Sequence, residues 1–278
     1  MNLIIGKNSF IAKKLLERDS FKFTSSNKLD KESFYLKLEE SEKFDYSILN
    51  NNTNIIFLAA ISSPDECNNK YDYAYRINVI GTKCFIKEAL KRGAKVLFFS
   101  SDVIYGNTIE KVDEQSKTNP FGNYAKMKDE VEKAFENKKN FKVFRLSYVL
   151  SKEDKYLKYL KYCVDNNQIA EVFHPFYRKV IYIEDVLDAI ERIIKKWDSF
   201  DNQKFNICGQ QNISRKDISI FYNNIIDNNL KCVYLEPSNN FWKARPKDIN
   251  IITNSLDKLL EREVTKIEDA IKIILKGE

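Results

Sequence analysis

The first half of the chain alternates short apolar runs with segments that carry apolar residues at helical spacing. The apolar runs predict strands over residues 2–5, 21–24, 55–60, 95–100 and 141–146. The segments between them predict helices over residues 10–17, 73–92 and 124–135. Strands that alternate with helices form a parallel sheet covered on both faces. The pattern therefore predicts a doubly wound α/β domain over residues 1–146.

The pattern loosens after about residue 150. Helices are predicted over residues 155–166, 183–196, 215–228 and 265–276, and short strands over residues 180–182, 205–207 and 231–235. This half lacks an alternation of its own that would build a second complete sheet. We therefore expect residues 147–278 to form mainly a smaller α/β lobe docked on the first domain, with some segments returning to that domain.

The composition excludes several classes of protein. Hydrophobic residues make up 43% of the chain and charged residues 31%, and no apolar run reaches the roughly 18 residues of a membrane span. The N-terminus lacks the basic region of a signal peptide, so no membrane role and a cytoplasmic location are expected. The net charge of +6 indicates either a solvated surface or a field that attracts a phosphorylated substrate. Without a basic tract or DNA-reading motif, it does not indicate nucleic-acid binding.

Cysteine and histidine usage argues against a disulfide framework and a metal site. His174 is the single histidine, so a Ser-His-Asp triad would have to use it as the base. Because it precedes Pro175, it is interpreted as structural. The cysteines are odd in number, widely spaced and free of any Cys-x-x-Cys pair, which is typical of reduced, mostly buried thiols. They are Cys67, Cys84, Cys163, Cys208 and Cys232.

A tyrosine and a lysine four residues apart are the most informative candidates for chemistry. Tyr124 and Lys128 open a helical pattern, so both side chains are expected on one helix face. An ammonium about 4 Å from a phenol is worth on the order of 4 kcal/mol at an effective dielectric of 20, which would bring the phenol pKa down from about 10. Tyr124 could then exchange a proton with a carbonyl, and Ser101 could hold the same oxygen. The rival pair Tyr148 and Lys152 lies at a strand end and need not share a face.

The segment after the first predicted strand has the character of a nucleotide-binding turn. It reads Gly6-Lys7-Asn8-Ser9-Phe10-Ile11-Ala12, with small residues where a pyrophosphate would meet the amides of a helix N-terminus. Two of the three expected glycines are replaced by Ser9 and Ala12, so a plain strand-to-helix turn remains an alternative. The second strand is followed by Ser25, Ser26 and Lys28 rather than an acidic residue. Hydroxyls and a lysine favour NADP, although NAD and an ordinary polar loop both stay open.

Several segments taken together resemble the extended short-chain dehydrogenase/reductase family of nucleotide-sugar epimerases, dehydratases and reductases. The resemblance covers nearly the whole chain, and the late pair Arg245-Pro246, preceded by Ala244, is most like the dTDP-4-dehydrorhamnose reductase group. The segments that carry it are the 6–12 turn, the strand that ends in Leu58-Ala59-Ala60, Asn78-Val79-x-Gly81-Thr82, Ser100-Ser101-Asp102-Val103-Ile104-Tyr105-Gly106, residues 119–128 and residues 178–185.

The resemblance implies a Rossmann domain with a C-terminal substrate lobe, and a role for each matching residue. Ser101, Tyr124 and Lys128 would be catalytic, with Lys128 also on the nicotinamide ribose. Asp102, Arg178 and Arg245 would face a nucleotide-diphosphate sugar, although a structural ion pair is an equal alternative for Arg245. The family also implies a homodimer through helices 73–92 and 124–135. The cofactor would be held by Gly6, Ser9, Phe10, Ile11, Ser25, Ser26, Lys28, Leu58, Ala59, Ala60 and Asn78, together with Tyr124 and Lys128.

The resemblance leaves the reaction open between several alternatives. The family's 4,6-dehydratases carry Asp-Glu directly after the catalytic hydroxyl, whereas this chain has Asp102-Val103, which argues against a dehydratase. The favoured function is NADPH-dependent reduction of a sugar ketone. The alternatives are a nucleotide-sugar epimerase with tightly held NAD and, in another class, a non-catalytic dinucleotide-sensing protein.

Overall fold

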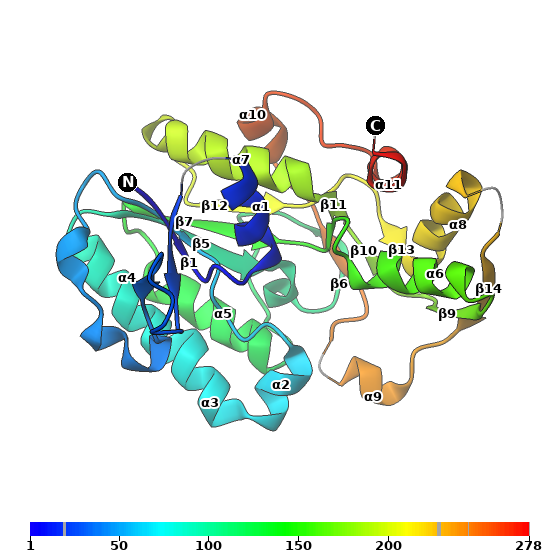
Figure 1. The fold of residues 1–278 in the computed structure, drawn as a ribbon, viewed down its shortest axis with the longest axis horizontal. Helices are drawn as coiled ribbons and strands as arrows, with labels where there is room; N and C mark the ends of the chain where they lie inside the picture. The colour runs from blue at the N-terminus through cyan, green and yellow to red at the C-terminus, as the bar shows by residue number, and fades with distance from the viewer. Residues whose placement is uncertain (19–20, 227–228, 244, 278) are drawn as a thin grey trace.

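A computed structural model describes residues 1–18, 21–226, 229–243 and 245–277. The centre is a seven-stranded sheet in which all neighbouring strands run parallel, in the order β12-β7-β5-β4-β1-β2-β3 (Figure 1). These strands are β1 (Asn2–Ile5), β2 (Lys22–Ser25), β3 (Phe34–Tyr35), β4 (Asn54–Phe57), β5 (Lys95–Ser101), β7 (Phe141–Leu146) and β12 (Lys204–Ile207). The doubly wound Rossmann-type fold expected from the sequence is confirmed.

Helices cover both faces of this sheet, because successive strand residues point to opposite sides. The first face holds Leu3, Phe57 and Phe98 against α4 and α5, whereas the second holds Ile4 and Leu97 against α1 and α7. Figure 1 shows the two layers above and below the strands. The helices of this domain are α1 (Phe10–Arg18), α2 (Pro64–Asn69), α3 (Tyr71–Tyr75), α4 (Thr82–Lys91), α5 (Asn123–Ala134), α7 (Ile183–Lys195) and α10 (Leu256–Leu260).

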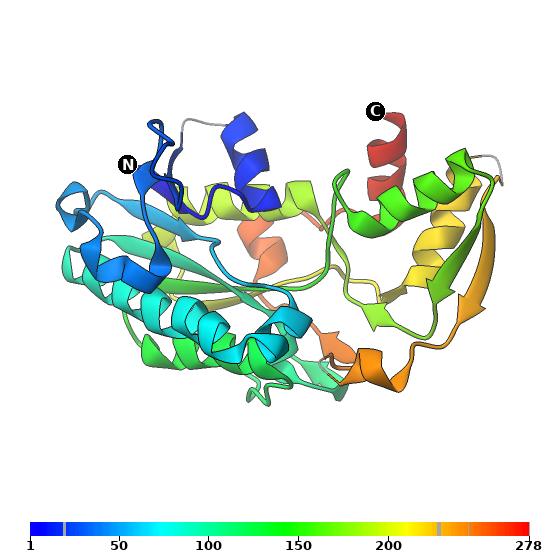
Figure 2. The ribbon, with the colours of Figure 1, turned by 60° about the horizontal axis from the view of Figure 1, so that its bottom comes forward.

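A smaller lobe is built mainly from the later part of the chain and lies at the carboxyl end of the sheet (Figure 2). The core on the α1 and α7 face continues into it without a break, through residues such as Leu160, Val172 and Ile218. Its helices are α6 (Lys155–Asp165), α8 (Arg215–Ile225), α9 (Asn239–Trp242) and α11 (Ile267–Lys276). Four short strand pairs complete the fold: β9 (Ile169–Phe173) with β14 (Lys231–Leu235), β10 (Tyr177–Arg178) with β13 (Ile213–Ser214), β8 (Val149–Leu150) with β11 (Ile181–Tyr182), and β6 (Thr108–Val112) with β15 (Ile249–Ile251).

The division of the chain at residue 146 stays a prediction. β12 comes after that position and pairs with β7 in the central sheet, and α7 packs against α1 on one face of the same sheet. The chain therefore enters the lobe, returns to the sheet and enters the lobe again. Segments from before and after residue 146 thus contribute to both the sheet domain and its junction with the lobe.

Two predicted elements differ from the structure for identifiable reasons. The strand predicted over residues 55–60 is β4, and it ends at Phe57, so Leu58, Ala59 and Ala60 leave the ladder and line a cavity. A short helix, α2, begins at Pro64, where Ser63 caps it, and ends at Asn69. The helix predicted over residues 73–92 begins slightly earlier than expected, at Tyr71. It contains a π-helical stretch, Arg76–Gly81, where a Cβ on Gly81 would lie 1.9 Å from the Leu38 carbonyl oxygen. That close approach requires glycine.

Candidate active site

The turn after β1 closes against the end of β4. Gly6 has φ +97°, and a Cβ built there would lie 2.9 Å from Ala59, so only glycine fits without a shift. The Gly6 N–H donates a hydrogen bond to Thr24 Oγ1 at 3.3 Å, which ties the turn to β2. Three strand ends thus meet at the carboxyl edge of the sheet, where open α/β sheets bind ligands.

A cavity of about 790 Å³ opens at this edge. Lys28 and Asn78, which were expected to contact the cofactor, do not line it. The Lys28 ammonium lies over the Tyr35 ring at 5.1 Å, and the Asn78 amide accepts from the Ile61 N–H at 2.8 Å and donates to the Ile61 carbonyl at 2.9 Å. Asn78 therefore holds the backbone of the segment after β4 in place without contacting the cavity itself. The other predicted cofactor residues all line the cavity: Gly6, Ser9, Phe10, Ile11, Ser25, Ser26, Leu58, Ala59, Ala60, Tyr124 and Lys128.

The donors and charges of this cavity fit a dinucleotide. The first turn of α1 presents N–H groups that have no partner within the helix, an arrangement that suits a pyrophosphate. Lys7, Lys37 and Glu39, which the sequence reasoning did not single out, also line the cavity, and the Lys7 ammonium forms an ion pair with Asp30. The buried Ser100 Oγ also lines the cavity and has no hydrogen-bond partner among the described residues. It is therefore free to bond a ligand.

Tyr124 and Lys128 lie on one face of α5 at the inner end of this cavity. The helix begins at Asn123, one residue before the predicted start, directly after Gly122 with φ +84°. The Lys128 Nζ donates to the Phe99 carbonyl at 2.7 Å and lies 4.6 Å from the centre of the Phe98 ring and 5.8 Å from that of Tyr124. The ammonium is thus anchored to β5, with the tyrosine ring beside it.

The electrostatic effect on Tyr124 is opposite in direction to the one expected from the sequence. Burial, with smaller contributions from Cys67 and Asp102, raises the pKa of the phenol above its ordinary value. Burial also lowers the pKa of Lys128 to about 8. The reason is that desolvation affects both groups, and the ammonium is directed to a backbone carbonyl. The phenol is therefore protonated at neutral pH.

Lys128 should make stability depend on pH in an unusual direction. Its folded pKa of about 8 lies below the value near 10.4 of an unfolded lysine, so between these values the unfolded chain binds more protons. Stability relative to Lys128→Met should therefore rise with pH, by about 2 to 3 kcal/mol between pH 7 and pH 10. Urea unfolding at both pH values measures it, with Lys126→Met on the exposed side of α5 as control. Equal pH slopes in wild type and Lys128→Met would contradict this prediction.

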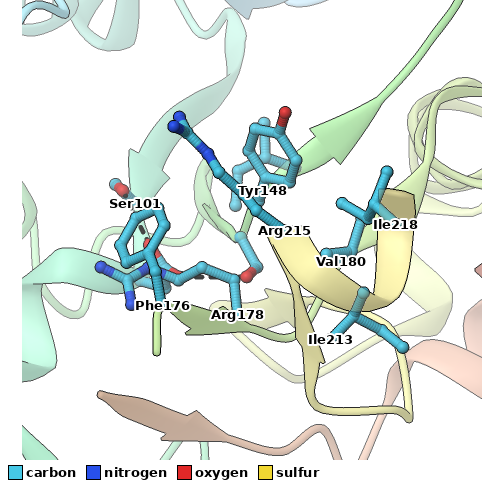
Figure 3. A pocket seen from close by; sticks show the side chains of 11 residues that line it. Ser101, Tyr148, Phe176, Arg178, Val180, Ile213, Arg215 and Ile218 are labelled. Carbon is cyan, nitrogen blue, oxygen red and sulfur yellow. Dashed lines mark hydrogen bonds between the residues drawn. The ribbon is translucent and has the colours of Figure 1, made fainter. Parts of the chain in front are cut away.

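Ser101 and Asp102 line a second cavity of about 210 Å³ (Figure 3). Leu146 lines both this cavity and the first one. The Ser101 hydroxyl donates to Asp102 at 3.1 Å, and the Ser147 hydroxyl donates to the other carboxylate oxygen at 2.9 Å. Burial raises the pKa of Asp102, while Arg178 and these hydroxyls oppose the rise. Because Ser100 lines the first cavity and Ser101 the second, the end of β5 lies at the boundary between the two cavities.

Arg178 and Arg245, both expected to face a diphosphate, use their donors within the protein. The buried Arg178 donates to the carbonyls of Pro246 at 2.7 Å and Lys247 at 2.9 Å, although its side chain still lines the second cavity. Arg245 forms a two-pronged ion pair with Asp65 at 2.6 and 3.1 Å, which joins the lobe to α2. The ion-pair alternative for Arg245 is the one present in the structure, and its contact with substrate stays a prediction. Ala244 lies outside the described residues.

Sequence reasoning missed several residues of the second cavity, among them Ser147, Tyr148 and Arg215. Tyr148 lies just before β8, lines the second cavity and donates from its hydroxyl to Asp154 at 2.5 Å. From the sequence alone, it was considered only as half of a rival pair. Arg215, the first residue of α8, reaches the same cavity from the lobe. Neither carries a short motif, and only the pairing of β10 with β13 brings Arg215 beside Arg178. No group of His, Cys, Asp and Glu within the described ranges is arranged to hold a metal ion.

The comparisons with known proteins agree with this architecture. dTDP-4-dehydrorhamnose reductase from Bacillus anthracis, solved with NADP, has a TM-score of 0.82 and 18% identity over 99% of this chain and 98% of that chain. UDP-glucose 4-epimerase from Thermotoga maritima, solved with UDP-glucose, has a TM-score of 0.79 and 16% identity over the same shares. These structures share the fold.

One curated relative and one family model match the sequence itself. Methionine adenosyltransferase 2 subunit beta from Xenopus tropicalis is 35% identical over 80 residues, which is 29% of this chain and about a quarter (24%) of that protein. Within the ranges that the structure describes, no helix is long and apolar enough to cross a membrane. The model of the RmlD substrate binding domain matches residues 1–277. The chain therefore belongs to the RmlD substrate-binding-domain family, whose dTDP-4-dehydrorhamnose reductases are NAD(P)-dependent oxidoreductases.

Proposed function

We propose that the protein uses NADPH to reduce a keto group on a nucleotide-activated sugar. The observation that carries this proposal is the meeting of two cavities at the end of β5. The larger one has the glycine turn and the Tyr124 and Lys128 pair, and the smaller one has Ser101 with two arginines. A hydride donor in the first would lie against a carbonyl in the second. Net consumption of NADPH on addition of a nucleotide 4-ketosugar tests the proposal.

Each residue of the proposed site has a task that its surroundings support. NADPH supplies the hydride when it is bound. Tyr124, protonated because burial raises its pKa, gives its proton to the oxygen that the hydride transfer leaves negative. Lys128 holds a positive charge beside the ring at neutral pH. Ser101 turns its hydrogen from Asp102 to the carbonyl oxygen, while Ser147 keeps the Asp102 carboxylate in place.

The preference for NADPH rests on the residues around the end of β2. Ser25 and Ser26 line the larger cavity where NAD-specific proteins of this fold place a carboxylate for the ribose. Lys37 lines it too, and a cation there suits a 2′-phosphate, whereas the Lys7 ammonium is paired with Asp30. Lys28 remains part of the proposal, although its ammonium lies over Tyr35 in the ligand-free protein.

Replacing Ser25 with Asp should reverse this preference. A carboxylate in place of the hydroxyl would repel the 2′-phosphate and accept from the ribose hydroxyl of NADH. We expect the ratio of the two dissociation constants to change by at least about tenfold, which corresponds to about 1.4 kcal/mol. Fluorescence titration of both dinucleotides measures it, with Ser199→Asp, on the exposed surface outside the cavity, as control. Equal affinities in the unaltered protein would disprove the assignment.

The epimerase alternative makes a different demand on the same site. An epimerase returns its hydride to the sugar, so it must keep NAD bound throughout and consumes none. The absorbance spectrum of the purified protein distinguishes the two functions, because retained dinucleotide is visible before any addition. A protein that carries NAD and converts one sugar epimer to another without using NADPH is an epimerase.

The non-catalytic alternative draws support from the Xenopus relative, which is named as a subunit of an enzyme. This chain nevertheless keeps Ser101, Tyr124 and Lys128 together at the two cavities. Dinucleotide binding without turnover of any nucleotide ketosugar would favour that alternative over the reductase.

A homodimer and a cytoplasmic location complete the proposal. Tyr73 and Ile80 are 48% and 57% exposed on the segment 73–92, through which the family resemblance implies a dimer. Large exposed apolar side chains on this segment favour contact with a second copy. All five cysteines are free thiols, as is common in the reducing cytoplasm.

A further inference from the structure

Arg215 is placed to act on whatever occupies the smaller cavity. It is the first residue of α8, and Figure 3 shows its side chain extending from the helix start into the cavity that Ser101 and Arg178 also line. Its guanidinium carbon lies 5.1 Å from the centre of the Tyr156 ring, 5.6 Å from that of Phe173 and 5.4 Å from that of Phe176. These rings hold the planar group in one orientation while leaving its N–H donors unused.

The other arginines near the cleft direct donors to acceptors within the protein. Arg178 bonds backbone carbonyls and Arg245 bonds Asp65, as described above. The Arg215 side chain is half-buried and forms no hydrogen bond or ion pair with any of the described residues. A partly desolvated guanidinium without an acceptor loses free energy that a ligand oxygen would restore.

The charges around the cavity also favour an anion. Phe176 lies between two guanidinium groups, with Arg178 at 4.4 Å from its centre and Arg215 at 5.4 Å. Burial lowers the pKa of Arg178 and the charge of Arg215 lowers it further, whereas Asp102 and Asp248 raise it. Asp102 is the one carboxylate among the described residues that line the cavity, and it is held by two serine hydroxyls. The cavity lining therefore carries two positive charges and one negative charge, with Asp248 acting on Arg178 from outside the lining, and a negatively charged ligand would correct the excess.

We propose that Arg215 binds the diphosphate of the nucleotide-sugar substrate and so fixes the sugar ketone at Ser101. The inference rests on the proposed function for the identity of the ligand. Arginine offers a planar fork that bonds two phosphate oxygens at once. Because Ser101 and Arg215 line the same cavity of about 210 Å³, an anion held at Arg215 leaves the neighbouring ring within reach of the serine.

Calorimetric titration with dTDP and UDP tests the proposal without requiring turnover. Arg215→Gln should weaken the affinity for the nucleoside diphosphate about 10- to 100-fold, the loss expected for charge-assisted hydrogen bonds. Arg215→Lys should lie between this variant and wild type, because it keeps the charge and loses the fork. The dissociation constant for NADPH should stay unchanged in both, since Arg215 does not line the larger cavity.

Lys216→Gln is the matched control, because it removes one positive charge from the next position of α8, where the ammonium lies over Tyr234 outside the cavity. An Arg215→Gln protein that binds both diphosphates as tightly as Lys216→Gln overturns the proposal. So does a wild-type protein that binds neither diphosphate. If Arg215→Gln lost affinity for UDP-glucuronic acid but bound UDP as tightly as wild type, the proposal would also be overturned, because Arg215 would then contact a sugar carboxylate instead of the diphosphate. Failure of the proposed reductase function is seen separately, as absence of NADPH consumption with diphosphate binding intact.

Discussion

Replacing Tyr124 with Phe should lower kcat about 10²- to 10⁴-fold, the usual contribution of a positioned general acid. The alkoxide that a hydride transfer leaves is a stronger base than a phenolate, so a phenol with a raised pKa still gives up its proton readily. Phe keeps the ring beside Lys128 but has no proton to give. Steady-state kinetics with a nucleotide ketosugar and NADPH measure the loss.

The fold and the NADPH affinity of Tyr124→Phe should stay nearly unchanged. The Tyr124 hydroxyl forms no hydrogen bond among the described residues, so its removal leaves no buried group without a partner. Tyr162→Phe, at an exposed position of α6, controls for the loss of a phenol elsewhere. Retention of more than about a tenth of the wild-type kcat would remove Tyr124 from the role of acid.

The parts of the site that the sequence predicted correctly are those set by local backbone chemistry. A glycine after the first strand and the four-residue spacing of Tyr124 and Lys128 each determine a conformation within a few residues. The sheet topology then brings these local features together, because parallel strands end at one edge and place residues 6, 25, 59 and 101 at the same cleft. The sheet and the cofactor cavity therefore follow from short-range pattern.

The substrate side of the cleft depends on contacts that no local pattern indicates. Arg245 reaches Asp65 across 180 residues, and Arg215 enters its cavity because β13 pairs with β10. The pKa of Tyr124 was misjudged for the same reason, since the sequence gives the charge of Lys128 but not the burial of either group or the carbonyl that holds the ammonium. Long-range packing decides which charges remain available to a ligand.

Removing the arginine of the buried ion pair behind the active site should have the largest effect on stability. The side chains of Arg145 on β7 and Glu132 on α5 are 2% and 3% exposed and meet at 2.7 and 3.1 Å. Arg145 also donates to the Tyr105 hydroxyl at 2.6 Å and to the Glu114 carbonyl at 3.3 Å. Its guanidinium thus joins the central sheet, α5 and the segment that follows β5.

We expect Arg145→Met to lower the free energy of unfolding by about 3–5 kcal/mol, because it leaves the Glu132 charge buried without its partner. The double variant Arg145→Met/Glu132→Met should recover most of this loss, since hydrophobic residues of similar size often replace a buried pair at little cost. Arg192→Met breaks the exposed pair with Glu261 and should cost no more than about 1 kcal/mol. Urea denaturation of the three variants separates these cases. If Arg145→Met were as mild as Arg192→Met, or the double variant as unstable as the single one, the uncompensated charge would not be the cause.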